Sequence, residues 1–157
     1  MIDHGRADAQ ALAHLRALGH CRVAFIKGQA FSSDTAIRWQ TIRAAARVER
    51  IAIDPALVGQ LEGNSPLPDL GYAVTPGLLR VRPRPGFDDI PSAACQHPGL
   101  TTIRQPLYEM RQCAADTLLA RIEQPAIRVP RTISLQPSLI VRGTTARPCL
   151  EARRARP

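Results

Sequence analysis

The stretch that decides the fold is HLRALGHCRVAFI, residues 14–26. Its leucines, together with Leu12, recur at helical spacing up to Gly19, and a short apolar run follows at residues 23–26. This spacing indicates an amphipathic helix, with Asp3 as candidate N-cap and Gly19 just past its end. A short apolar run bounded by turn residues is typical of a buried parallel strand. The stretch therefore predicts a helix followed by a strand, as in an open α/β sheet.

The residues after this unit continue the alternation. Ser33 or Asp34 is expected to cap a second helix that ends near Val48, with Ile37 and Ile42 among its buried residues. Further along the chain, the pattern predicts a strand stub at 51–53, a loop at 54–68, and helical material at 69–79 that Pro76 and Gly77 interrupt.

The last third of the chain is patterned more regularly. A strand is expected at 101–103, then a helix with Pro106 in its first turn that ends at Gln124, then strands at 132–135 and 138–141. The helix carries one apolar stripe: Leu107, Met110, Ala114, Leu118 and Ile122. Such a stripe is usually part of a core, but it is exposed if its partner is absent.

Composition limits the class of protein. The 157 residues suit one domain, and the net charge is +8 with only one lysine. The arginines are scattered and cluster only in the last eleven residues, with few aromatic residues beside them, which argues against a dedicated nucleic-acid surface. The four cysteines form no C-x-x-C pair, and no signal peptide or membrane-spanning run is evident. A cytoplasmic protein without metal or cofactor is expected.

Four segments, in this order, resemble the ligand-binding part of LacI/GalR (lactose-repressor-type) transcriptional regulators. The first is residues 14–26 with Gly28 and Arg38, which is similar to the family's "HL…LGH.RIAFI.G…S…R". The other three are GFDDIP at 86–91, PGLTTIRQP at 98–106 and LQPSLIVRGTT at 135–145. Because four collinear segments cover most of the chain, the family resemblance is specific.

The resemblance implies a two-lobed, periplasmic-binding-protein-like α/β fold of type I. An open parallel sheet is flanked by helices, and a sugar-like effector binds between the lobes of a homodimer and alters its grip on operator DNA. Measured against the family, residues 1–147 are a partial sensor domain. Within it, 1–96 are second-lobe material, 98–124 a first-lobe remnant and 131–145 return strands; 148–157 are expected to be a basic disordered tail.

Three departures from the family pattern accompany the resemblance. No helix-turn-helix headpiece or complete first lobe is recognisable, and one strand–helix–strand unit is missing between Pro85 and Gly86. Thr41 also replaces a glycine usual in the family. The chain is thus expected to be a truncated and internally deleted sensor.

Arg38 and Asp88 are the predicted effector-binding residues. By resemblance the arginine hydrogen-bonds the effector, and its planar guanidinium suits vicinal hydroxyls or a carboxylate. Asp88 closely follows an expected strand, where ligands bind in open α/β folds, whereas its neighbour Asp89 is expected to brace the following turn. Ser32 and Ser33 could touch ligand but are more typical caps, and His14 and His20 are expected to be structural.

Three other functional classes remain open from the sequence. One is a degenerate gene product without ligand function, and another is an arginine-rich, non-specific binder of nucleic acid. The third, a periplasmic sugar-binding protein, is disfavoured by the lack of a signal peptide. An enzyme is the least favoured class, because no nucleophile, metal or general acid/base motif accompanies the aspartates.

Overall fold

The computed structural model describes residues 1–63, 85–124, 126 and 132–148. The predicted helical material at 69–79 and almost all of the predicted tail at 148–157 lie outside the described residues, and so does Cys149.

The amino-terminal helix α1, His4–Ala17, has the ends that the sequence predicts. The Asp3 carboxylate accepts a hydrogen bond from the backbone N–H of Arg6 at 2.9 Å, which satisfies one of the free donors of the first turn. Gly19 has a φ of 92°, a left-handed conformation that glycine adopts without steric cost after a helix end. Leu12 and Leu15 of this helix are buried.

The first sheet pairs β1, Phe25–Gln29, in parallel with β2, Val58–Leu61. Helix α2, Ser33–Val48, connects β1 to the turn before β2. The predicted strand at 23–26 is placed two residues too early, because the hydrogen-bonded ladder begins at Phe25. The predicted strand stub at 51–53 is wrong, since only Ala52 makes an isolated bridge, to Arg22.

The strand β2 lies inside the segment predicted as loop. Asp54 accepts a hydrogen bond from the N–H of Ala56 at 3.0 Å and so starts a 3-10 turn at Pro55–Leu57. This turn brings the short, glycine-containing strand beside β1. The predicted cap of α2 is also wrong: the N-cap is Ser32, whose side chain makes no capping hydrogen bond.

The second sheet contains β3, Gly86–Asp88, β4, Thr102–Arg104, and β5, Ser138–Ile140, in that order. β3 and β4 are parallel, as an α/β fold predicts, whereas β5 runs antiparallel to β4. The short helix α4, Pro91–Cys95, lies between β3 and β4 in the sequence. Leu135, expected in a strand, makes only an isolated bridge to Ile2.

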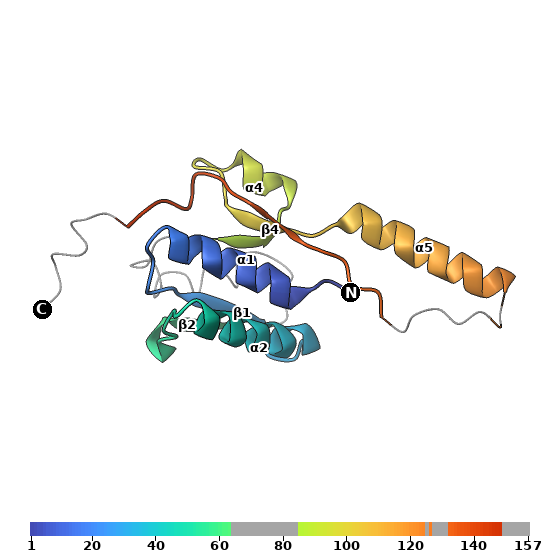
Figure 1. The fold of residues 1–157 in the computed structure, drawn as a ribbon, viewed down its shortest axis with the longest axis horizontal. Helices are drawn as coiled ribbons and strands as arrows, with labels where there is room; N and C mark the ends of the chain where they lie inside the picture. The colour runs from blue at the N-terminus through green and yellow to red at the C-terminus, as the bar shows by residue number, and fades with distance from the viewer. Residues whose placement is uncertain (64–84, 125, 127–131, 149–157) are drawn as a thin grey trace, which may run out of the picture.

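Helix α1 joins the two sheets. It contacts α2 on one side and β4 and β5 on the other, and Figure 1 shows it between them. The larger core cluster is built from α1, β1 and α2, with Leu15 and Ala46 almost fully buried. Ile42 packs against this cluster as expected, but the expectation for Ile37 is wrong, because that side chain is 45% exposed.

Helix α5, Leu107–Glu123, extends away from the body of the molecule (Figure 1). Pro106 is its N-cap rather than a first-turn residue, and Gln124 ends it as predicted. The helix has no buried residue. The apolar stripe that the sequence shows on this helix is therefore exposed: Leu118 and Ile122 are 61% and 66% accessible.

Candidate functional site

A hollow of about 530 Å³ lies between the two sheets. Successive residues border it on both sides: 23–26, which lead into β1, and 85–87, which lead into β3. Side chains along a strand point alternately to the two faces of its sheet. A space bordered by successive residues therefore lies beside the edge of the strand rather than over one face. Among the strands of the described residues, β1 and β3 stand at the ends of their sheets, so the hollow separates two strand edges. Leu12 and Leu15 of α1 contribute to its largely apolar wall.

Arg38, one of the two predicted effector-binding residues, lines this hollow from α2. Its guanidinium carbon lies 3.8 Å from the centroid of the Phe87 ring, a cation–π arrangement that fixes the planar group against β3. Its Nε is buried and has no hydrogen-bond partner in the structure. A buried donor without a partner is costly, so an acceptor that reached this N–H would remove that cost.

Asp88 ends β3 but is not among the residues that line the hollow. Its side chain is exposed, and its Oδ1 accepts a hydrogen bond from the Gln105 amide. The backbone φ of Asp88 is 80°, in the left-handed region. The structure therefore brings Arg38 to Phe87, the residue preceding Asp88, and does not bring the two predicted site residues into one lining.

Asp89 acts as a brace, as the sequence predicts, but between strands. Its side chain is 3% exposed and pairs with Arg142 at 2.6 Å and with Arg104 at 2.7 Å. The Arg142 hydrogen bond is the main cause that lowers the pKa of the Asp89 carboxyl, and the Arg104 hydrogen bond adds to it, although burial opposes both. The carboxylate thus ties β3 to β4 and to the segment after β5.

Asp8 is a site residue that the sequence reading missed. It lies on α1 and lines the hollow together with Arg38, with 6% of its surface exposed. The Thr41 hydroxyl, at the position where the family usually has glycine, donates to its Oδ2 at 2.5 Å. The sequence does indicate a buried position for Asp8, since it occupies the same helical face as Leu12 and Leu15.

Phe87 was also missed, although it lies beside a predicted site residue. Its ring has the Arg38 guanidinium on it and the His4 ring 6.2 Å away. Nothing in the motif around it distinguishes a ring that supports a ligand contact from one that fills a core. The support that the Phe87 ring gives to the Arg38 guanidinium can be recognised only in the folded structure, where α2 and β3 lie together.

The two histidines at the corner between α1 and β1 are structural, as expected. His14 Nε2 lies 2.9 Å from the Thr145 hydroxyl, and His20 Nε2 lies 2.7 Å from the Ala146 carbonyl oxygen. Both therefore fasten this corner to the segment after β5. Ser32 and Ser33, considered as ligand contacts, do not line the hollow.

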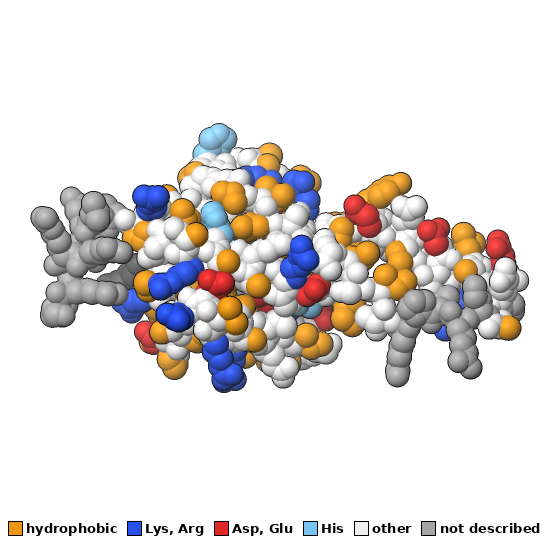
Figure 2. Space-filling model, in the orientation of Figure 1, with side chains coloured by type: hydrophobic (Ala, Val, Ile, Leu, Met, Phe, Trp, Pro, Cys, Tyr) orange, Lys and Arg blue, Asp and Glu red, His pale blue; other side chains and the backbone are white. Residues whose placement is uncertain are grey.

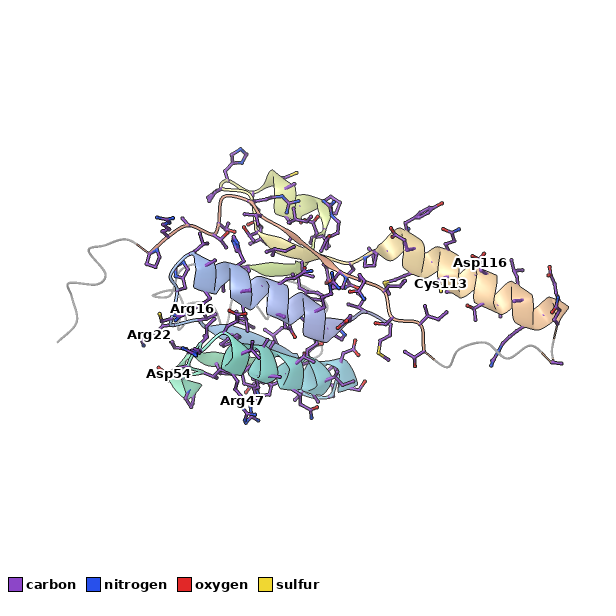
Figure 3. The ribbon with its side chains drawn as sticks, in the orientation of Figure 1. Arg16, Arg22, Arg47, Asp54, Cys113 and Asp116 are labelled. Atoms are coloured by element: carbon purple, nitrogen blue, oxygen red, sulfur yellow. The ribbon has the colours of Figure 1, made fainter. Side chains whose placement is uncertain are left out.

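The cations do not form a continuous stripe on the face that Figure 2 displays; they are spread over the body among acidic and apolar side chains. Figure 3 shows Arg16, Arg22 and Arg47 at the end of the body away from α5, with Asp54 beside Arg22. The Arg22–Asp54 pair is 3.6 Å long, and both side chains are largely exposed. Such a pair contributes little to stability.

Within the described ranges, no cluster of His, Cys, Asp or Glu side chains could hold a metal ion. No helix in the same ranges has the length and apolar character required to cross a membrane.

Comparison with known proteins places this geometry in context. Residues 85–145 match the family model of the periplasmic binding protein-like domain. An HTH-type transcriptional regulator encoded in the aml 5′ region of Streptomyces violaceus is 43% identical over 63 residues, which are 40% of this chain and 80% of that protein. The ribose operon repressor of Escherichia coli K12 is 44% identical over 59 residues, 38% of this chain and 18% of the repressor.

The fold has solved counterparts over nearly its full length. A LacI family transcriptional regulator from Enterococcus faecium, solved with bound ribose, superposes with a TM-score of 0.76 and 23% identity. The superposition covers 94% of this chain and 65% of that one. The chain therefore spans slightly less than two thirds of this structural counterpart and a small part of the ribose repressor.

Proposed function

Because the chain belongs to the LacI family of transcriptional regulators and has its periplasmic-binding-protein-like effector domain, we propose that it senses a small, sugar-like effector in the hollow that Arg38 lines. The proposal follows its relatives, which are transcriptional regulators rather than enzymes. Ligand binding would change how a regulator dimer holds operator DNA.

The observation that carries the proposal is the state of Arg38. Its guanidinium faces an apolar hollow, lies on an aromatic ring and keeps a buried Nε–H without an acceptor. Ligand sites typically combine a largely apolar wall of about 300 to 1,000 Å³ with a few fixed polar groups. A hydroxyl that accepts from this N–H would remove the cost of the unpaired donor.

Asp88 is proposed as a contact at the mouth of the hollow. It sits at the carboxyl end of β3, where ligands approach open α/β sheets. A ligand hydroxyl would compete there with the Gln105 amide that now donates to it. Loss of the Gln105 bond on ligand binding would release the segment that precedes α5 from β3.

The test is ligand-dependent thermal unfolding with D-ribose, cellobiose and other neutral sugars as probes. An effector that binds the folded state raises the unfolding midpoint. We expect Arg38→Ala to abolish this rise. Arg43→Ala, which removes an exposed arginine from the same helix, is the matched control and is expected to retain it. An unchanged rise in Arg38→Ala would remove Arg38 from the site.

The partners follow from the same premise and are proposals too. A second copy of the chain is the expected partner in a homodimer. Operator DNA would be contacted through a helix-turn-helix headpiece rather than through the residues around the hollow.

A degenerate chain without ligand function is the second candidate. The exposed apolar face of α5 favours it, and so do the edges of β1 and β3 that pair with no strand among the described residues, since such surfaces are usually covered. This candidate predicts a broad unfolding transition with strong binding of an apolar dye and no response to any sugar. A sharp transition that shifts with a sugar would eliminate it.

A further inference from the structure

Asp8 and Arg38 bring opposite charges to the same hollow from two different helices. Asp8 is nine-tenths buried on α1, and Arg38 enters from α2. Their electrostatic attraction favours the charged form of Asp8. Lys27 of β1 lies 5.5 Å from the Trp39 ring and is not part of the lining.

Thr41 holds the Asp8 carboxylate in place. Its hydroxyl oxygen is 2.5 Å from Asp8 Oδ2 and 2.9 Å from the Arg38 carbonyl oxygen, so it links the two helices at the level of the hollow. The structure gives Asp8 Oδ1 no hydrogen bond from the described residues. One carboxylate oxygen is therefore fixed, and the other is free to accept from a ligand.

Burying the Asp8 carboxylate costs free energy, and the folded protein bears this cost. Burial raises the pKa of Asp8, and the Thr41 hydrogen bond and the charges of Arg38 and His4 only partly oppose that rise. A carboxyl group at this apolar position of α1 adds no packing that an alanine or leucine would not supply. The cost is explained if the carboxylate has a task inside the hollow.

We propose that Asp8 is a specificity-determining residue, which with Arg38 makes the hollow selective for neutral ligands that carry adjacent hydrogen-bond donors and acceptors, such as vicinal diols, and excludes anions. One hydroxyl accepts from Arg38 while its neighbour donates to Asp8. An anionic group that approached Arg38 would face the Asp8 charge at close range. The inference rests on the proposed function, since it concerns the same hollow.

The first experiment measures anion binding with inorganic phosphate as the probe, on the full chain at pH 7.5 and constant ionic strength. We expect no phosphate-dependent rise of the unfolding midpoint in the wild type. Asp8→Asn keeps the shape of the side chain, and its apparent phosphate affinity is expected to rise by about tenfold or more. The double variant Asp8→Asn/Arg38→Ala is expected to lose this gain, because Arg38 is the group that holds the anion.

Asp34→Asn is the matched control. It removes an exposed carboxylate from the first turn of α2 and changes the net charge by the same amount. Its phosphate affinity is expected to equal that of the wild type. Equal phosphate binding by wild type and Asp8→Asn would overturn the proposal, and so would equal gains in Asp8→Asn and Asp34→Asn or the absence of any gain in Asp8→Asn.

A second measurement keeps this inference separate from the proposed function. Binding of neutral sugars is tested in the same series, and Asp8→Asn is expected to weaken any sugar that Arg38 binds. If no sugar stabilises the wild type but Asp8→Asn gains phosphate through Arg38, the effector proposal fails and the charge-selective hollow stands. If sugars bind through Arg38 with equal affinity in Asp8→Asn, the role of Asp8 is wrong and the effector proposal stands.

Discussion

At the scale of single residues, Asp89 is the side chain on which the second sheet most depends. It is almost fully buried and contacts two arginines from different parts of the chain, Arg104 on β4 and Arg142 beyond β5. Arg142 also donates to the Leu100 carbonyl oxygen at 2.7 Å, which adds a further link to the same network. One carboxylate therefore holds together three segments that the short strands alone connect weakly.

Replacement of Asp89 by asparagine is expected to lower the free energy of unfolding by about 2 to 3 kcal/mol at pH 7. The amide has the same shape but leaves two guanidinium groups without their counter-charge. The loss stays below that of a fully buried pair, because the Arg104 side chain is 54% exposed and can be solvated. Urea unfolding followed by circular dichroism measures it, with Asp88→Asn as the neighbouring control.

The difference between wild type and Asp89→Asn should also depend on pH. The pKa of Asp89 is lower in the folded state than its usual value of 3.8, so the folded state binds the proton less tightly than the unfolded one. The stabilisation is therefore complete above about pH 5 and is lost as the pH falls below 4 toward the folded-state pKa. A difference that stays constant down to pH 3 would contradict the ion-pair explanation. The raised pKa of Asp8 acts in the opposite direction but is common to both proteins.

The sequence was informative about residues wherever a motif carried their role, and gave at most a helical-face position elsewhere. Arg38 lines the hollow, and its predicted contact with an effector stays a prediction. Asp89 is a brace, but it links strands rather than the turn that the sequence predicts. Asp8 escaped because no motif contains it and its partner Thr41 lies 33 positions away. Whether Asp88 contacts a ligand stays a prediction, since the structure places it outside the lining.

At the scale of elements, α5 differs from the other long helices. Helices α1 and α2 each bury residues against the core, whereas α5 buries none and presents Leu118, Leu119 and Ile122 to solvent. An exposed apolar surface of this kind contributes nothing to the folding of the described residues. It instead promotes association with other apolar surfaces.

The double variant Leu118→Gln/Ile122→Gln is therefore expected to unfold within about 0.5 kcal/mol of the wild type. Its binding of an apolar fluorescent dye and its self-association in sedimentation experiments should both decrease. Leu12→Gln, at a core position that is 4% exposed, is the contrasting control and should destabilise strongly. A large loss of stability in the double variant would mean that the stripe on α5 is covered in solution.

Elements with long periodic patterns were predicted best. The helices α1 and α5 end within a few residues of their predicted bounds, since a stripe repeated over several turns defines both and Asp3 also caps α1. The short strands were predicted less well, and β2 was taken for loop. Its four residues include a glycine and too little alternation to be recognised without β1 beside them.

At the scale of the whole molecule, the two small sheets share no hydrogen-bonded strand pair within the described residues. Helix α1 lies between them, and the contact of Arg38 on α2 with Phe87 on β3 is a further link. The sequence predicted one open parallel sheet, incomplete between Pro85 and Gly86. In the structure the hollow lies at this junction, with Pro85 and Gly86 in its wall. Pairing between sheets depends on contacts distant in sequence, which no local pattern encodes, so the separation could not have been foreseen from periodicity.

This arrangement makes the cooperativity of unfolding depend on α1, and Leu15 is the residue that tests it. The side chain is fully buried, belongs to the larger core cluster and lines the hollow between the sheets. We expect Leu15→Ala to cost about 3 to 5 kcal/mol, whereas Leu118→Ala, the same truncation at an exposed site, should cost little. Hydrogen exchange followed by mass spectrometry should show faster exchange in both β1 and β4 in Leu15→Ala. Faster exchange in β1 alone would mean that the second sheet is stable without α1.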